Sequence, residues 1–337
     1  MAAVATVTGP ARIVALDFTK GTLVLIMVLY HWLNYFMGPV GFIYRYLRFL
    51  PPSFIFITGF LISHVYLSRS HLTAGQLARR LAARGFKILV VFAFLNLIKL
   101  AVIPDSRNAL VQYLSSRTLT AVYITGSFGT NKAAAFSVLV PIGYLLVLSA
   151  GLILAREVYR HIFHLICAMA LFCTFLLDSH GFNSANLQLI TIGLLGVSSG
   201  YIAIGEINRF AIFPYILIGA YGCYLSIITL WEVNYPVQIL GVSLTLMLIY
   251  SLGLRYDLGR LGQLTVLMGH YSLFAYIAQI AVVQLLYNGL RRFAFTPGVL
   301  ALSFLLACVL TMLSVTIMDG ARRRARPVDV LYKTIFA

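Results

Sequence analysis

Long apolar stretches alternate with short polar ones along the whole chain. A helix that crosses the hydrocarbon core of a bilayer needs about 20 mainly apolar residues, and the long stretches approach that length. The pattern therefore predicts an all-α polytopic membrane protein, with residues 1–337 forming a single transmembrane domain. Ten transmembrane helices are expected, over 13–36, 52–67, 88–103, 133–155, 159–177, 186–204, 210–230, 236–254, 263–286 and 297–318.

Two of the connecting segments carry a pattern of their own. In residues 68–87 basic side chains recur at helical spacing with apolar ones between them, which predicts an amphipathic helix lying on the inner leaflet. The basic residues are Arg79, Arg80, Arg84 and Lys87, and the apolar ones are Leu77, Leu81 and Phe86. The mixed segment 104–132 predicts a short interfacial helix around Leu110–Tyr123.

Composition supports lipid as the solvent for most of the chain. Hydrophobic residues make up 61% and charged residues 10%, whereas soluble domains carry about 25% charged residues. The net charge of +16 is explained by Lys and Arg in short loops, most of them on one side if the N-terminus is inside. Both termini are then cytoplasmic, and nucleic acid is not an expected partner. The sequence does not indicate an oligomeric state.

The sequence lacks several common signatures of chemistry. All four cysteines lie in apolar stretches without a CxxC pair or a zinc-like spacing, so no metal is expected. No Walker A or GxGxxG motif, HExxH motif or serine nucleophile elbow is present either. These observations argue against nucleotide hydrolysis and a hydrolase.

The first span is unusually polar on one face. Lys20 and His31 are eleven residues apart, which leaves them only about 20° apart around a helix and about 16 Å apart along it. Asp17 lies one turn before Lys20. Asp17 and Lys20 could be interfacial side chains that reach toward water, with His31 bonded to a neighbour. Three aligned polar groups in lipid are costly, however, which favours a functional face.

The order of the groups on this face suits group transfer. A cation at the cytoplasmic mouth can hold a phosphorylated donor. An imidazole deeper in the membrane can take a proton from a hydroxyl or an amine near neutral pH. We therefore expect Lys20 to act as an anion clamp, His31 as a general base, and Asp17 to pair with Lys20 or orient it.

The same residues carry a resemblance to a known family. Asp17-Phe18-Thr19-Lys20-Gly21 followed by His31 resembles the opening of the acyltransferase family 3 membrane proteins, which include surface-polysaccharide O-acetyltransferases and the periplasmic-glucan succinyltransferase. It is also similar to heparan glucosaminide N-acetyltransferase-like proteins. Gly59-Phe60-Leu61 resembles a second-span motif of the family, with Thr58 in place of its Ser. Gly269, Ser272 and Tyr276 resemble a late motif, after which Gln279 replaces a frequent His.

The resemblance implies a reaction and its partners. It implies transfer of an acyl group, with acetyl the first expectation, from cytoplasmic acyl-CoA to a hydroxyl or amine of a glycan or small acceptor at the outer face. It also implies a bacterial inner membrane, no metal, and acetyl-CoA or another acyl-CoA as donor. Lys20, Arg80, Arg84, Lys87 and His64 are the expected donor-binding residues. Contact of the loop arginines with lipid head groups is the alternative.

The acceptor side is less specific. Asp178 and His180 end the fifth span, and Asp178 could orient His31. Trp231 and Glu232 lie in a short outer loop, where they could hold a sugar or anchor the chain at the interface. Gln279 lies in the ninth span, where polar packing between helices is the alternative to a role in the site.

Two other function classes fit the same pattern. A transporter or flippase of a lipid-linked or anionic solute could line its path with Lys20 and His31. Broken helices would favour that function, and Gly193, Gly196 and Gly200 could break the sixth span. A structural subunit of polysaccharide assembly would instead tolerate substitution of both residues.

Overall fold

The computed structural model describes residues 13–38, 41–67, 72–102, 106–126, 136–211, 213–231, 233–255, 259–292 and 294–336. The regular structure of these residues is entirely helical, which confirms the predicted all-α class. Two short π-helices, η1 and η2, continue α3 and α6. The elements are α1 Val14–Phe36, α2 Gly41–Leu47, α3 Leu50–Leu61, η1 Ile62–Leu67, α4 Ala74–Val102, α5 Ser106–Tyr113, α6 Ser116–Leu119, η2 Thr120–Thr125, α7 Leu139–Arg156, α8 Ile162–Ser179, α9 Ala185–Ser199, α10 Ile204–Ala211, α11 Pro214–Leu230, α12 Tyr235–Arg255, α13 Arg260–His270, α14 Ser272–Leu290, α15 Pro297–Arg324 and α16 Arg326–Phe336.

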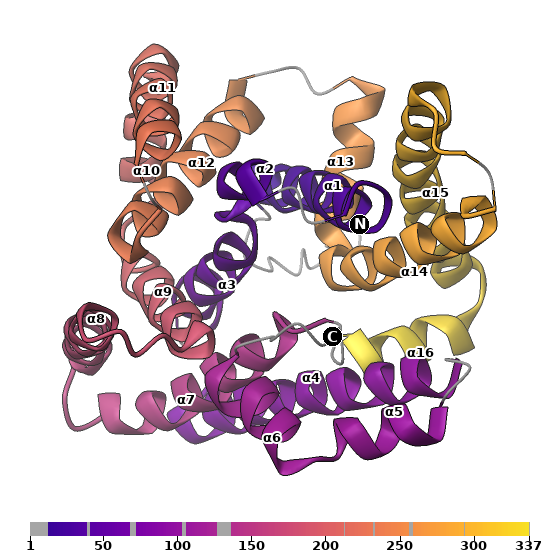
Figure 1. Cartoon of the computed structure of the whole chain (residues 1–337). Helices are drawn as coiled ribbons and strands as arrows, with labels where there is room; N and C mark the ends of the chain where they lie inside the picture. The colour runs from indigo at the N-terminus through magenta and orange to yellow at the C-terminus, as the bar shows by residue number, and fades with distance from the viewer. Residues whose placement is uncertain are drawn as a thin grey trace, which may run out of the picture.

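Helix α1 lies at the centre of the bundle (Figure 1). It packs against α3, α12, α13, α14 and α15. The Nε1–H of Trp32 donates a 2.8 Å hydrogen bond to Ser303 Oγ on α15, which fixes the rotation of α1 among its neighbours. The polar face predicted for the first span therefore points into protein rather than into lipid.

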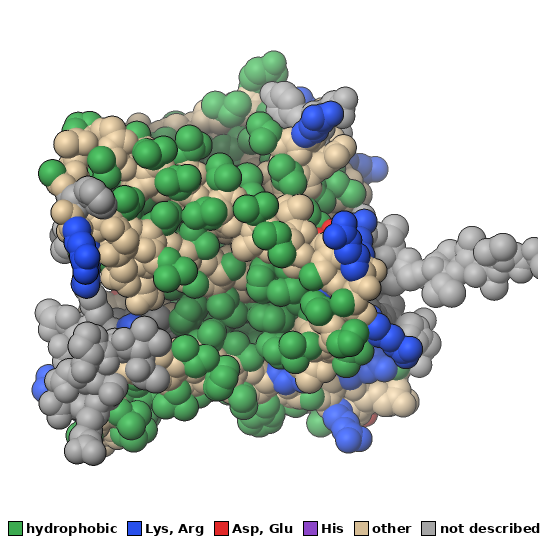
Figure 2. Space-filling view, turned by 90° about the vertical axis from the view of Figure 1, so that its right-hand side faces the viewer, with side chains coloured by type: hydrophobic (Ala, Val, Ile, Leu, Met, Phe, Trp, Pro, Cys, Tyr) green, Lys and Arg blue, Asp and Glu red, His purple; other side chains and the backbone are tan. Residues whose placement is uncertain are grey.

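The outer surface of the bundle is suited to a bilayer. Within the described residues, eight helices are long and apolar enough to cross a membrane, and a bent pair, α9 with α10, raises the number to nine. Helix α11 is a shorter apolar helix. Figure 2 shows a broad field of hydrophobic side chains across one face, with Lys and Arg gathered toward its two sides. The protein is therefore a multi-pass membrane protein, while the count of ten spans and the cytoplasmic termini stay predictions.

The prediction of a separate amphipathic surface helix over 68–87 is wrong. The part of this segment that the structure describes belongs to α4, which runs without a break into the third span. Leu77 and Leu81 are buried. A Cβ on Gly85 would lie 2.8 Å from the carbonyl oxygen of Gly143 on α7. Because α4 and α7 already approach this closely at Gly85, Leu77 and Leu81 pack on protein instead of lying on a leaflet, whereas Phe86 is 58% exposed.

The predicted ninth span, 263–286, is also divided. Helix α13 ends at His270 and α14 begins at Ser272. Hydropathy does not detect this break because both halves are apolar. The interfacial helix predicted around Leu110–Tyr123 is replaced by three short pieces, α5, α6 and η2.

Two further features lie near the ends of spans, and the first is a break of the sixth span at Gly200, one of the three glycines considered for it. Helices α9 and α10 meet at a bend of 104°, with Gly200 as the C-cap of α9. Helix α9 itself runs unbroken through Gly193 and Gly196. The residues after α15 form α16, which packs against α15 near the C-terminus (Figure 1).

Candidate functional site

The start of α1 is held in place by an unusually close crossing with α13. A Cβ on Gly269 would lie 1.7 Å from the carbonyl oxygen of Asp17, and one on Gly21 would lie 1.8 Å from that of Thr265. Only glycine permits two helix backbones to approach this closely at both positions. The Gly269 of the late sequence motif therefore positions the polar end of α1.

Asp17 and Lys20 form the ion pair that their spacing predicted. Lys20 Nζ lies 2.6 Å from Asp17 Oδ1, and the two side chains are 16% and 7% exposed. Removing two charges from water is costly, so such a pair is retained where it is well bonded or used. Asp17 directs the ammonium group of Lys20 at the edge of a cavity.

We call this cavity the basic cavity. Its volume is about 200 Å³, and its lining includes Lys20, Tyr66, Arg84, His270, Ser272 and Tyr276. Arg84 donates a 2.6 Å hydrogen bond to the hydroxyl oxygen of Tyr66. Two cations from distant parts of the sequence, Lys20 and Arg84, thus face the same space, together with many apolar side chains. A ligand with an anionic group and an apolar arm matches this lining.

His31 lines neither the basic cavity nor a second cavity, but its ring neighbours one lining residue of each. Its ring centroid is 6.4 Å from that of Tyr276, which lines the basic cavity. The ring centroid of Tyr30 is 5.3 Å away from that of His31. His31 is half-buried, and its Nε2 atom is buried without a hydrogen-bond partner. Since a buried polar atom without a partner costs about 1–3 kcal/mol, this nitrogen is available for a ligand.

The second cavity, the tyrosine cavity, begins at Tyr30. It measures about 690 Å³, and its lining includes Tyr30, Tyr44, Arg48, Asp178, Gln188 and Tyr235. Tyr44 packs edge-on against Tyr30 and donates a 2.7 Å hydrogen bond to Asn34 Oδ1. Aromatic faces with hydroxyl, amide and charged groups around them suit a polar ligand of sugar-like chemistry.

The structure brings together only some of the predicted donor-binding residues. Lys20 and Arg84 line the basic cavity, whereas Arg80 and Lys87 are exposed on α4 and are absent from its lining. The ring of His64 stacks on Phe60 at 5.4 Å, and it too is absent from the lining. Arg80 and Arg84 are one turn apart and lie on nearly the same face of α4, so the basic pattern alone did not distinguish them.

The predicted acceptor residues also separate. Asp178 lines the tyrosine cavity, but its Oδ1 atom accepts a hydrogen bond from Gln188 at 3.4 Å, so the expected orientation of His31 by Asp178 is not what the structure shows. His180 and Trp231 are exposed at the ends of α8 and α11, outside that lining. Glu232 lies outside the described residues.

Gln279 differs from these residues because it is completely buried. It lies on α14 one turn after Tyr276, and both polar atoms of its amide are without a hydrogen-bond partner. The polar helix packing considered for Gln279 would have supplied such partners. Its amide therefore remains a candidate for the site.

Several cavity residues were missed by sequence reasoning. Tyr30 neighbours His31 on α1, Tyr66 holds Arg84, and Arg48 lines the tyrosine cavity. The chain is rich in tyrosine and in basic residues, so the residue types alone do not mark these positions as part of a site. Only the position of Tyr30 beside His31 could have suggested it.

The fold and the apolar surface define a class of protein, a helical membrane protein with several spans and a polar core around α1. Comparisons of the chain with protein-family models, curated proteins and solved structures found no match. The resemblance drawn from the sequence motifs therefore stays a prediction.

Proposed function

We propose that the protein is a membrane-embedded acyltransferase that moves an acyl group, with acetyl the first expectation, from acyl-CoA to a hydroxyl or amine of a glycan or small acceptor. The observation that carries the proposal is the proximity of the His31 ring to one lining residue of each of two cavities that differ in chemistry. Tyr276 joins its ring to the basic cavity, and Tyr30 joins it to the tyrosine cavity. The motif resemblance in the first span supports the same reaction.

In this proposal the basic cavity takes the donor. Lys20 and Arg84 neutralise donor phosphate, and the apolar walls accept the pantetheine arm. The tyrosine cavity takes the acceptor. In an inner bacterial membrane, with the N-terminus inside, the basic cavity would open to the cytoplasm and the tyrosine cavity to the outer face.

The transfer step uses the unpartnered nitrogen of His31. Nε2 accepts the proton of the acceptor hydroxyl while the hydroxyl oxygen attacks the thioester carbonyl. The carbon–sulfur bond then breaks, and the imidazolium returns the proton to the departing thiolate. An acyl-histidine relay would use the same nitrogen as a nucleophile.

Replacement of His31 tests this role. His31→Ala should lower transfer by about 10²–10⁴-fold, the usual contribution of a general base. Folding and membrane insertion should be unchanged, because the Nε2 atom makes no hydrogen bond that would be lost. The assay is transfer of radiolabelled acetyl from acetyl-CoA to cell-envelope material. Normal transfer by a correctly folded His31→Ala protein would refute the proposal.

Donor binding can be tested with a matched pair of variants on α4. Arg84→Gln should weaken binding of acetyl-CoA to the purified protein, since Arg84 lines the basic cavity. Arg80→Gln removes the same charge one turn earlier, from an exposed position, and should leave binding unchanged. Equal losses in both variants would indicate general electrostatic attraction rather than a site.

The bend between α9 and α10 favours a second candidate, a transporter or flippase of a lipid-linked or anionic solute. Helices broken within the membrane are typical of transporters, and the angle here is 104°. A purified protein that binds no acyl-CoA but moves an anionic solute across vesicles would support this function over acyl transfer.

A further inference from the structure

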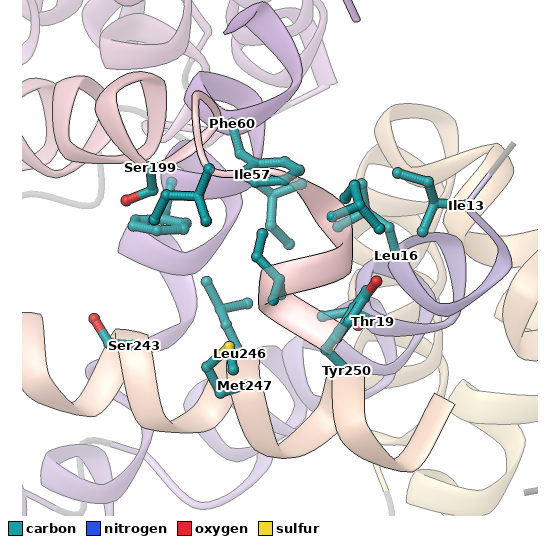
Figure 3. Close-up of a pocket in the computed structure, with 14 residues that line it drawn as sticks. Ile13, Leu16, Thr19, Ile57, Phe60, Ser199, Ser243, Leu246, Met247 and Tyr250 are labelled. Carbon is teal, nitrogen blue, oxygen red and sulfur yellow. The ribbon is translucent and has the colours of Figure 1, made fainter. Parts of the chain in front are cut away.

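A third cavity, the apolar cavity, shares Ile57 of α3 with the basic cavity. It measures about 250 Å³ and is enclosed by α1, α3, α12 and the bend between α9 and α10. Figure 3 shows Leu16, Ile57 and Leu246 around one space, each from a different helix. The proposed acyl transfer does not use this cavity.

The polar side chains of the lining have their hydrogen bonds satisfied by the protein. Each hydroxyl donates to an acceptor on its own helix or on a neighbouring one. These bonds are Thr19 to the carbonyl of Ala15 at 2.8 Å, Ser199 to that of Leu195 at 2.8 Å, Ser243 to that of Ile239 at 3.0 Å, and Tyr250 to Asn208 Oδ1 at 2.9 Å. A ligand would meet only apolar surface that gains from burial, which selects a hydrocarbon.

The size of the cavity is compatible with part of a hydrocarbon chain. An apolar cavity of about 150 Å³ in another protein stays dry and takes up benzene. This one is larger, and its hydroxyl groups leave little to attract water. It has room for a segment of an acyl chain.

The bilayer is the side from which such a chain can enter. Ile202, in the bend between α9 and α10, lines the cavity and is 48% exposed. Leu240, on α12 one turn before Ser243, is 44% exposed. The cavity is thus continuous with apolar surface that faces lipid. Toward the basic cavity it is closed by Ile57, which lines both cavities and is 4% exposed.

We propose that the apolar cavity binds an acyl chain of a membrane phospholipid, inserted between α12 and the α9–α10 bend. The chain fills space that would otherwise be empty between five helices. The bend then serves to open a lipid site, and the site is independent of acyl-CoA.

Photo-crosslinking in vesicles tests this site directly. The probe is a phosphatidylcholine with a diazirine in the middle of one acyl chain, present as a small fraction of dioleoylphosphatidylcholine vesicles that contain the full chain. Peptide mass spectrometry should find crosslinks on Leu246 and Phe60, which are only 7% and 8% exposed, and also on outward-facing residues such as Leu302, which is 56% exposed. Crosslinks confined to outward-facing side chains would overturn the proposal.

A pair of serine variants separates the cavity from the surface. Ser243→Phe fills the cavity and should abolish crosslinks on Leu246 and Phe60 while those on Leu302 remain. Ser226→Phe is the control, because Ser226 makes the same bond to the carbonyl four residues earlier, at 3.1 Å, but is exposed on α11. Retention of the buried crosslinks in Ser243→Phe would contradict the site.

An excess of oleoyl-CoA distinguishes the two sources of an acyl chain. It should leave the wild-type crosslinks on Leu246 and Phe60 unchanged, because Ile57 separates the two cavities. Loss of these crosslinks would show that the cavity takes the acyl chain of the donor, and would overturn the bilayer as its source. The competition with oleoyl-CoA and the crosslinking of the wild-type protein need no variant, so both tests remain valid even if Ser243→Phe fails to fold.

Discussion

The buried ion pair of α1 offers a test in which stability and binding can be separated. Lys20→Met removes the ammonium group 2.6 Å from the Asp17 carboxylate, which is on a residue only 5% exposed. Loss of one partner from a buried pair costs about 3–5 kcal/mol. Because the Lys20 side chain is 16% exposed at the cavity edge, we expect a loss near the lower value, about 3 kcal/mol.

The double variant Asp17→Asn with Lys20→Met should recover most of this stability, because the charge of Asp17 is removed together with its partner. Titration of the purified proteins with a denaturing detergent measures the free energy of unfolding. The interaction energy of the two substitutions gives the strength of the pair. A Lys20→Met protein as stable as wild type would refute the assignment of a stabilising buried pair.

These two variants and the single variant Asp17→Asn also test the anion clamp. Acetyl-CoA binding should fall in Lys20→Met and stay low in the double variant, although the double variant is stable again. Asp17→Asn should retain most of the binding, since the cation is still present. Binding that follows stability rather than the presence of Lys20 would assign Lys20 a structural role.

Two further predictions concern the packing and the C-terminal helix. Gly269→Ala should destabilise the protein by about 1–3 kcal/mol, since its Cβ would lie 1.7 Å from the carbonyl oxygen of Asp17. Gly289→Ala is the control and should not destabilise it, because a Cβ there meets nothing within 4 Å. Equal free energies of unfolding for the two variants in detergent titration would contradict the close crossing. Hydrogen bonds from Lys333 and Arg322 hold the pKa of Asp329 below its usual value. The ionised carboxylate therefore stabilises the docked α16 fully above the ordinary Asp pKa of about 3.9, and this stabilisation is lost as the pH falls through the lower folded-state pKa. A nitroxide on Thr334 should gain mobility over that range in the wild type, and the same pH response in Asp329→Asn would assign it to another group.

Much of the architecture could be predicted because it depends on local periodicity. Apolar stretches of bilayer length determine where helices cross, and the alignment of Asp17, Lys20 and His31 follows from the pitch of one helix. The Asp17–Lys20 pair was confirmed for the same reason. The predictions that failed involve contact between helices: the surface helix at 68–87 belongs to α4, and the ninth span breaks at Tyr271.

The sequence by itself thus determined that this is a helical membrane protein with a polar face on its first span. Tertiary structure decided which groups meet that face. Tyr276 lies beside His31, and Arg84 rather than Arg80 shares a cavity with Lys20. These pairings depend on the distances and angles at which helices cross, such as the contact of Gly269 with Asp17. Such crossings are set by the shapes of surfaces far apart in the chain, which periodicity within one helix does not encode.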